Sequence, residues 1–264
     1  MAIELKDVSF SYPNGYLANE HLNLTINQGE KVGIIGQNGA GKTTAVKLMN
    51  RLNKPTEGDV IIDGINTKDK TTAQIAKYVG YVFQNPDDQI FNQTVKDEVR
   101  YMLKKSRMDP KLIKEKSDRA LELTGLIDSK RKNPFDLPLP TRKFLTIAAV
   151  IATDPKYIIL DEPTAGLDIR GIEVLEKLMD TLTAEGMGVI TITHDMEFVA
   201  RNFDRIVVMA HKNIIMDSTA QEVFARNDII EDARIKKPEI ALIAEVLGIR
   251  EEILFVDELV DLLP

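Results

Sequence analysis

Residues 36–44, with the sequence Gly-Gln-Asn-Gly-Ala-Gly-Lys-Thr-Thr, limit what this chain can fold into more than any other feature. They follow an apolar run at 32–35 that predicts a buried strand, and they precede residues 45–49, which predict the start of a helix. A glycine-rich loop between a strand and a helix is typical of phosphate binding, because its N–H groups and the helix N-terminus form a cradle for phosphate oxygens. The alternative is a glycine-rich turn before an ordinary helix.

The side chains of this loop indicate which part of a nucleotide each residue would bind. Lys42 is expected to reach the β- and γ-phosphates as a point charge, and the Thr43 hydroxyl is expected to hold Mg²⁺. The remaining residues predicted to surround the phosphates are Gly36, Asn38, Gly39, Ala40, Gly41 and Thr44. The sequence therefore predicts a P-loop protein that binds a nucleoside triphosphate together with Mg²⁺.

Charge and composition exclude several other classes of protein. The chain has 34 Lys and Arg against 41 Asp and Glu, a net charge of -7, which argues against a protein built to coat nucleic acid. It has no cysteine, and therefore no disulfide framework, zinc-thiolate site or cysteine nucleophile. The first residues lack the apolar core of a signal peptide, and apolar runs such as 147–152 are far too short to cross a bilayer. We expect a soluble or peripheral intracellular protein.

Hydrophobic periodicity predicts an α/β fold along the 264 residues. Strands are predicted at 3–10, 22–26, 32–35, 60–64, 79–83, 157–160, 188–193, 206–209 and 214–216. Helices are predicted within the insertion 94–124 and at 141–152, 174–183, 241–246 and 256–263. Residues 133–140 contain three prolines, which should exclude a regular element there.

Polar side chains follow three of the predicted strands, at the edge where ligands gather in open α/β sheets. Asp161 and Glu162 come directly after four apolar residues, and paired acids there need a partner such as phosphate-bound Mg²⁺. Asp161 is then expected to hold the metal and Glu162 to polarise the attacking water. Gln84 would orient water or touch Mg²⁺, although a glutamine that caps a loop fits equally. His194 would hydrogen-bond a γ-phosphate, with a surface histidine as the alternative.

Tyr12 follows the first predicted strand and offers a flat ring to a nucleotide base. Stacking of a base on an aromatic ring stabilises binding by about 1–3 kcal/mol. A side chain that packs at the strand end is the alternative interpretation. The phosphate-binding loop elsewhere in the chain favours the stacking role.

These residues together resemble the ATP-binding subunit of ABC transporters over about residues 3–225. In chain order the matching features are the base-stacking aromatic Tyr12, the Walker A loop at 36–43, the Q-loop Gln84, the Walker B pair Asp161 and Glu162, the D-loop at 165–168 and the switch histidine His194. Residues 84–95 and the C-terminal extension resemble, more narrowly, the ATPases of energy-coupling factor importers for vitamins and cobalt. The resemblance implies a P-loop α/β core with a small antiparallel sheet and a helical subdomain at about 90–152, all within residues 1–232. Residues 233–264 are then an appended interaction element.

The resemblance also implies partners. Two such subunits would close head to tail over two ATP molecules with Mg²⁺ and would drive a transmembrane coupling subunit and a substrate-binding membrane protein. The place of such a subunit is the cytoplasmic face of the membrane. Recognition of the transported substrate would belong to another subunit, so this sequence does not name it.

One segment departs from the family pattern. Where the family has a signature loop, Leu-Ser-Gly-Gly-Gln, residues 137–141 read Leu-Pro-Leu-Pro-Thr. In the family this loop binds the γ-phosphate of ATP held by the opposite subunit, but Pro138 and Pro140 have no N–H to donate. The loop should bind phosphate poorly, with Arg142 and the positive end of the following helix as possible compensation. A heterodimer with a sibling ATPase is therefore expected rather than a homodimer.

Two other functions would use the same motifs, but features of the sequence argue against each of them. A soluble ABC ATPase that acts on ribosomes or DNA would need two nucleotide domains or a long coiled-coil insertion, and neither fits in 264 residues. A regulatory module that senses ATP without hydrolysing it is favoured by the altered signature loop. Glu162 and His194, both present, argue against that module.

Overall fold

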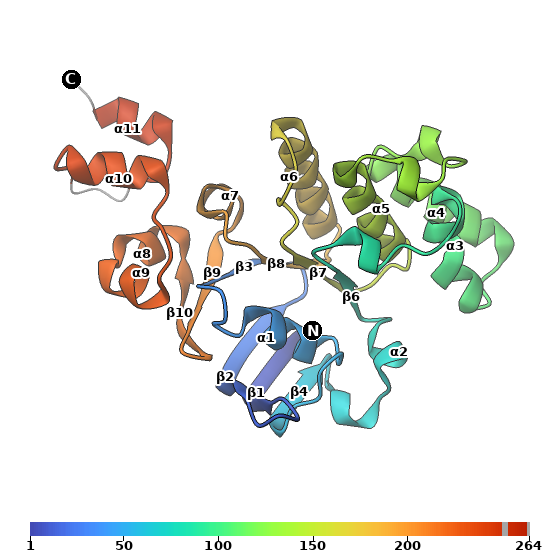
Figure 1. The fold of residues 1–264 in the computed structure, drawn as a ribbon, viewed down its shortest axis with the longest axis horizontal. Helices are drawn as coiled ribbons and strands as arrows, with labels where there is room; N and C mark the ends of the chain where they lie inside the picture. Colours follow the sequence, from blue (N-terminus) through green and yellow to red (C-terminus); the bar gives the residue numbers. More distant parts are fainter. Residues whose placement is uncertain (250–252, 263–264) are drawn as a thin grey trace. The chain divides into compact units, whose positions relative to one another are not determined.

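The computed structural model describes residues 1–249 and 253–262, which form both strands and helices (Figure 1). The chain divides into two compact units. Unit 1 contains Met1–Asn27, Lys31–Asp69 and Ile190–Pro264, and unit 2 contains Gln28–Glu30 and Lys70–Val189. The predicted α/β class is confirmed.

A small antiparallel sheet in unit 1 has the strand order β2-β1-β4-β5. Its strands are β1 (Ala2–Ser11), β2 (Leu17–Asn27), β4 (Glu57–Ile62) and β5 (Ile65–Asn66). Alternation in β1 sets the register, because Ile3 and Leu5 are both buried and lie opposite Ile26 and Leu24 of β2. The predicted strands 3–10, 22–26 and 60–64 are confirmed, although β2 begins five residues earlier than expected.

Unit 1 also contains the strand that leads into the phosphate loop. This strand, β3 (Lys31–Ile35), pairs in parallel with β9 (Arg205–Ala210), and β9 pairs antiparallel with β10 (Asn213–Thr219). Val32 to Ile35 are all buried, as a continuous apolar run in a parallel sheet should be. Helix α1 (Lys42–Met49) follows the loop. Both the strand before the loop and the hairpin at 206–216 are confirmed.

The C-terminal part of unit 1 is mostly helical. After β8 (Gly188–Ile192), which leads from unit 2 into unit 1, the helices are α7 (Met196–Asn202), α8 (Ala220–Ala225), α9 (Asn227–Ala233), α10 (Glu239–Val246) and α11 (Val256–Leu262). Helices α10 and α11, red in Figure 1, confirm two predicted helices, and Leu263 at the end of the second prediction lies outside the described residues. In the part of the chain that the structure describes, no helix is long and apolar enough to span a bilayer.

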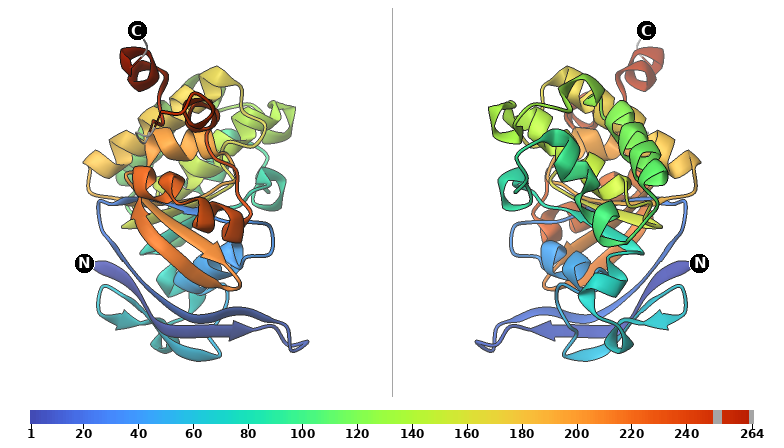
Figure 2. Two further views of the ribbon diagram at one scale, coloured as in Figure 1. Left: turned by 90° about the vertical axis from the view of Figure 1, so that its left-hand side faces the viewer. Right: turned by 90° about the vertical axis from the view of Figure 1, so that its right-hand side faces the viewer.

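Unit 2 combines a parallel strand pair with a group of helices. Strand β6 (Val79–Val82) pairs with β7 (Tyr157–Asp161) in parallel, so the carboxyl ends of both strands lie at one edge. The helices are α2 (Thr72–Ile75), α3 (Val95–Lys105), α4 (Pro110–Leu123), α5 (Leu139–Ile151) and α6 (Ile169–Ala184). Helices α3, α4 and α5 lie side by side, drawn in green in Figure 1 and Figure 2. The helical insertion is thereby confirmed as two helices, α3 and α4, each with a side-chain N-cap.

The prediction that three prolines exclude regular structure from residues 133–140 was wrong. A 3-10 turn occupies Pro134–Asp136, and α5 begins at Leu139, two residues before the predicted start. Pro138 is the N-cap and Pro140 lies in the first turn. N–H groups of the first turn have no partner within a helix, so a proline there costs no hydrogen bond. Three further 3-10 turns lie at Thr67–Asp69, Pro86–Asp88 and Ile127–Ser129.

Candidate functional site

The loop at 36–44 has a backbone that requires its glycines. Gly36 has φ 144, and a Cβ there would lie 2.1 Å from the Met209 carbonyl oxygen of β9. Gly41 has φ 101, and a Cβ there would lie 2.5 Å from Asn19 Nδ2 of β2. Gly39 has φ 84 and open space around it, so at the tip of the loop only the backbone conformation favours glycine.

Lys42 is the first residue of α1, and its side chain folds back into the loop. Its Nζ donates to the carbonyl oxygens of Gly36 at 2.7 Å and Gln37 at 3.0 Å, and only 7% of the residue is exposed. The helix start is capped by Gly41, and no acidic residue lies in the first turn. A helix N-terminus with a buried ammonium and no acidic residue in its first turn suits an anion. The geometry of this loop therefore fits a phosphate group.

The other predicted loop residues differ in exposure. Asn38 and Gly39 lie exposed at the tip, Thr43 is half-buried, and Ala40 and Thr44 are buried. Two contacts that hold this loop have no signal in the local sequence. Asn19 Nδ2 donates to the Gly41 carbonyl oxygen at 3.2 Å, and the Gln37 N–H donates to the Ala233 carbonyl oxygen at the end of α9 at 3.1 Å.

Tyr12 lies directly after β1 and is tied to the helix that follows the phosphate loop. Its hydroxyl forms a hydrogen bond of 3.1 Å with the Thr44 hydroxyl, and its ring packs edge-on against Phe10 at a centroid distance of 4.9 Å. At the same time 37% of Tyr12 is exposed. The packing interpretation and the stacking interpretation are therefore compatible, because one part of the ring packs while another part remains accessible.

In unit 2, Asp161 is the last residue of β7 and is buried. The Tyr81 hydroxyl of β6 donates to Asp161 Oδ2 at 2.6 Å. Burial, together with the hydrogen bond to the Asp161 carboxylate, raises the pKa of Tyr81 far above its ordinary value. Tyr81 thus stays protonated and remains a donor. The residue lies 80 positions away in the chain, so no local pattern indicated this contact.

Glu162 follows at once and has an unusual backbone. Its φ is 51, in the left-handed region, although it is not a glycine and precedes Pro163. Lys143 Nζ, from α5, donates to the Glu162 carbonyl oxygen at 2.9 Å. Burial lowers the pKa of Lys143, while the carboxylates of Glu162 and Asp161 oppose that shift. Lys143 belongs to none of the sequence motifs and was not predicted as a site residue.

Gln84 lies exposed two residues beyond β6, at the start of a loop that side-chain hydrogen bonds hold in place. The side chain that caps the turn after it is Asn85, whose Oδ1 accepts from the Asp87 N–H at 3.2 Å. Gln89 then folds back, and its Oε1 accepts from the Phe83 N–H at 3.1 Å. The capping role considered for Gln84 therefore belongs to Asn85, and Gln89 is a structural residue that sequence analysis missed.

His194, Asp195 and Asp168 each lie within one of the two units. His194 lies exposed after β8, in unit 1. Asp195, next to it, is the N-cap of α7 and accepts from the Phe198 N–H at 3.0 Å. Asp168, at the end of the predicted D-loop, is the N-cap of α6 and accepts from the Gly171 N–H at 2.8 Å. Both aspartates thus define where a helix starts.

The segment at 137–141 leads into α5 with few groups for an anion. Pro138 and Pro140 lack N–H groups, and the Leu139 side chain is exposed. Arg142 does not extend toward the start of the helix as a free cation, because its Nη1 lies 3.0 Å from Asp87 Oδ1 and its guanidinium lies over the Phe135 ring. For Arg142 to compensate for the altered loop, its guanidinium would have to leave this ion pair with Asp87.

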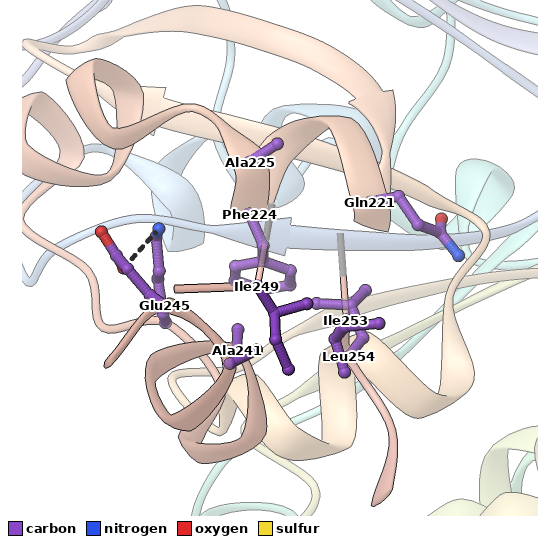
Figure 3. Close-up of a pocket in the computed structure, with 10 residues that line it drawn as sticks. Gln221, Phe224, Ala225, Ala241, Glu245, Ile249, Ile253 and Leu254 are labelled. Atoms are coloured by element: carbon purple, nitrogen blue, oxygen red, sulfur yellow. Dashed lines mark hydrogen bonds and ion pairs between the residues drawn. The ribbon is translucent and has the colours of Figure 1, made fainter. Parts of the chain in front are cut away.

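A cavity of about 310 Å³ lies in another part of unit 1, between α8 and the C-terminal segment (Figure 3). Phe224 of α8 and Ala241, Ile249 and Ile253 of the extension contribute apolar side chains to it. Lys237 and Glu245, also in its lining, pair at 3.0 Å. None of the predicted site residues lines this cavity, so it is separate from the nucleotide-binding features.

Comparisons with known proteins agree with these features. Residues 19–165 match the model of the ABC transporter family. A putative ABC transporter ATP-binding protein of Pyrococcus furiosus is 38% identical over 248 residues, 94% of each chain. The energy-coupling factor transporter ATP-binding protein EcfA of Methanocaldococcus jannaschii is 36% identical over 253 residues, 95% of this chain and 91% of that protein.

A solved structure gives the same result for the fold. The protein cbiO1 of Clostridium perfringens, described as part of the ABC transporter complex cbiONQ, superposes with a TM-score of 0.80 at 30% identity. The alignment covers 93% of this chain and 98% of that one. With its phosphate loop, its buried acid at the end of β7 and these similarities over nearly its whole length, the chain belongs to the ABC transporter family as an ATP-binding ATPase.

Proposed function

We propose that this chain is the ATP-hydrolysing subunit of an energy-coupling factor type importer, for vitamins or metal ions. It works as a heterodimer with a sibling ATPase, peripheral to the cytoplasmic face of the membrane. Its other partners are a transmembrane coupling subunit and a substrate-binding membrane protein, and it binds no nucleic acid. The observation that carries the proposal is the 36% identity to the Methanocaldococcus jannaschii EcfA protein, which extends over 95% of this chain.

The proposal assigns each predicted site residue a role. Residues 36–44 bind the phosphates of ATP, and the geometry of the loop supports this role. Tyr12 stacks on the base, and the exposure of its side chain supports that role. Thr43, Gln84 and Asp161 are the residues that would hold Mg²⁺, and the ion would neutralise charge on the phosphates. Glu162 polarises the attacking water, with Gln84 and His194 orienting water and γ-phosphate.

We further propose that residues 233–264 serve as an interaction element beside an ATPase domain of residues 1–232. Supporting this, α10 and α11 carry exposed apolar side chains, among them Val246, which is 86% exposed, and Val260. Helices that face only water rarely expose several large apolar residues together. Part of this element, residues 250–252 and 263–264, lies outside the described residues.

A second candidate function is an ATP-sensing module that hydrolyses little ATP. The two prolines of the altered signature loop, which supply no N–H groups to a γ-phosphate, favour it. The buried acids Asp161, at the end of β7, and Glu162, directly after it, favour hydrolysis instead. The two functions differ in the steady-state ATPase rate of the assembled complex.

Purification of the tagged chain from detergent-solubilised membranes tests the importer proposal. We expect a second ABC ATPase and at least one integral membrane protein to co-purify with it. Recovery of the chain with ribosomes or nucleic acid, or without any membrane protein, would contradict the proposal.

We expect Tyr12→Ala to weaken ATP and GTP binding by similar amounts, because stacking uses the π-face that all bases share. The loss should be roughly 5- to 150-fold, the equivalent of about 1–3 kcal/mol. Tyr12→Phe keeps the ring but loses the hydrogen bond to Thr44 and should bind nearly as well as the wild type. Titration with fluorescent nucleotides measures these affinities, and a base preference that disappears in Tyr12→Ala would show that position 12 reads base edges instead.

Residues 85–95 are proposed to contact the membrane subunit, because they are largely polar and follow the proposed catalytic Gln84. Phe91 is 61% exposed, and its ring packs edge-on against Tyr101 of α3 at 4.7 Å, so the segment is continuous with the helical insertion. We expect Asp88→Ala and Phe91→Ala to reduce transport while ATP hydrolysis continues. Leu112→Ala, at an exposed apolar residue of α4, is the matched control. Unchanged transport by both variants in an assembled complex would refute the contact.

A further inference from the structure

The peptide at Glu162 is held in a conformation that its sequence disfavours. A residue with a side chain rarely has positive φ, and a residue before proline favours an extended backbone. Glu162 has φ 51 and precedes Pro163. Such backbone strain persists only where the surrounding structure enforces it, and it is found frequently at functional sites. Some contact must therefore hold this turn.

Lys143 makes such a contact. Its ammonium donates to the Glu162 carbonyl oxygen at 2.9 Å, and the residue is only 6% exposed. The neighbours of Lys143 on α5, including Phe144, Leu145 and Ile147, are buried apolar side chains. A buried ammonium is costly compared with an apolar side chain of the same volume. Its presence at this position therefore needs an explanation beyond packing.

We propose that Lys143 is a positioning residue, whose ammonium holds the Glu162 peptide in the left-handed turn from which the Glu162 carboxylate is directed. This inference rests on the proposed role of Glu162 in polarising the attacking water. The turn sets the direction of the Cα–Cβ bond of Glu162, so the carbonyl that Lys143 binds and the carboxylate that acts on water move together. Charge-assisted hydrogen bonds of this kind are stronger than neutral ones, which suits a contact that opposes strain.

The test compares steady-state ATP hydrolysis by the membrane-purified complex carrying wild-type chain or Lys143→Met. We expect kcat to fall by roughly 10- to 100-fold, since small misplacements of catalytic groups have effects of that size, with KM for ATP unchanged. Lys143→Arg keeps a charged donor and should retain more activity than Lys143→Met. Should the methionine variant fail to assemble, Lys143→Gln, which is uncharged and shorter, replaces it with the same expectation.

Thr146→Val is the matched structural control. Thr146 is also buried on α5, and its hydroxyl donates to the Lys143 carbonyl oxygen at 2.8 Å rather than to Glu162. We expect this variant to lose stability in thermal unfolding while kcat stays at the wild-type value. An equal fall of kcat in Thr146→Val and Lys143→Met would mean that packing of α5 matters rather than the contact with Glu162, and would overturn the proposal.

A double variant separates this inference from the proposed function. If Lys143 acts through Glu162, adding Lys143→Met to Glu162→Gln should cause no further loss of kcat. If the double variant lost kcat by the product of the two single losses, the inference about Lys143 would be overturned while the role of Glu162 would stand. The same holds if Lys143→Met kept the wild-type kcat while Glu162→Gln was inactive. Wild-type hydrolysis by Glu162→Gln would overturn the role of Glu162 and the inference with it.

Discussion

Replacing Glu162 by glutamine is expected to stop most ATP hydrolysis by the heterodimer, whereas the equivalent replacement in the sibling ATPase should cost much less. An amide has nearly the shape of the carboxylate but does not polarise water as a base does. The asymmetry arises because each ATP would be bound by one subunit and completed by the signature loop of the other. ATP on this chain would face the loop of the sibling, and ATP on the sibling would face residues 137–141 of this chain.

The structure of residues 137–141 supports a large difference between the two sites. Pro138 at the N-cap and Pro140 in the first turn leave α5 without two of the N–H groups that such a loop would offer. The Arg142 guanidinium is paired with Asp87 and would have to leave this ion pair to replace them. Loss of two hydrogen bonds to a γ-phosphate, at about 1.5–3 kcal/mol each in the transition state, would slow the second site by roughly 10² to 10⁴.

Steady-state ATPase rates of the two single variants measure this asymmetry. The Glu162→Gln complex should keep the low rate of the impaired site, and the sibling variant should keep nearly the wild-type rate. Equal losses, or a larger loss from the change in the sibling, would mean that the proline-containing loop supports catalysis after all.

The second large effect is expected for Lys42→Ala, which should lower ATP affinity at this chain by roughly 10- to 150-fold. That range corresponds to the loss of a charge-assisted contact of about 1.5–3 kcal/mol. In this structure the Lys42 ammonium lies against the carbonyl oxygens of Gly36 and Gln37, inside the curve of the loop. Alanine removes both the charge and the side chain that fills this curve, so binding should weaken through both losses.

Lys47→Ala is the matched control for that variant. Lys47 lies in the last turn of the same helix, away from the phosphate loop. Nucleotide titration by fluorescence, with circular dichroism to show that both variants are folded, should give wild-type affinity for Lys47→Ala and weak binding for Lys42→Ala. Wild-type affinity in a folded Lys42→Ala variant would refute the assignment of the loop.

Features encoded in short stretches of sequence could be predicted. The apolar run before Gly36 identified β3, and the glycine pattern identified the loop, because both depend on residues adjacent in the chain. Asp161 and Glu162 stood out for the same reason, since acids after four apolar residues need a partner. Helix α8 was missed although its signal was present, as Thr219 and Glu222 form a capping box.

Contacts between residues far apart in the chain could not be predicted. The hydrogen bond of Tyr81 to Asp161 joins two strands, and that of Lys143 to Glu162 joins a helix to a strand end. Neither residue belongs to a local motif, so a single sequence offers no sign of the pairing. The wrong start of α5 had a different cause. Proline is excluded from the interior of a helix, but the first turn of a helix accommodates proline.

The steady-state ATPase rate of the purified chain alone, compared with that of the membrane-purified complex, tests the central claim most directly. In a homodimer both nucleotides would face residues 137–141. The chain alone should therefore hydrolyse ATP roughly 10² to 10⁴ times more slowly than the complex does. Hydrolysis by the chain alone at the rate of the complex would contradict the claim that residues 137–141 impair hydrolysis. It would also contradict the need for a sibling ATPase.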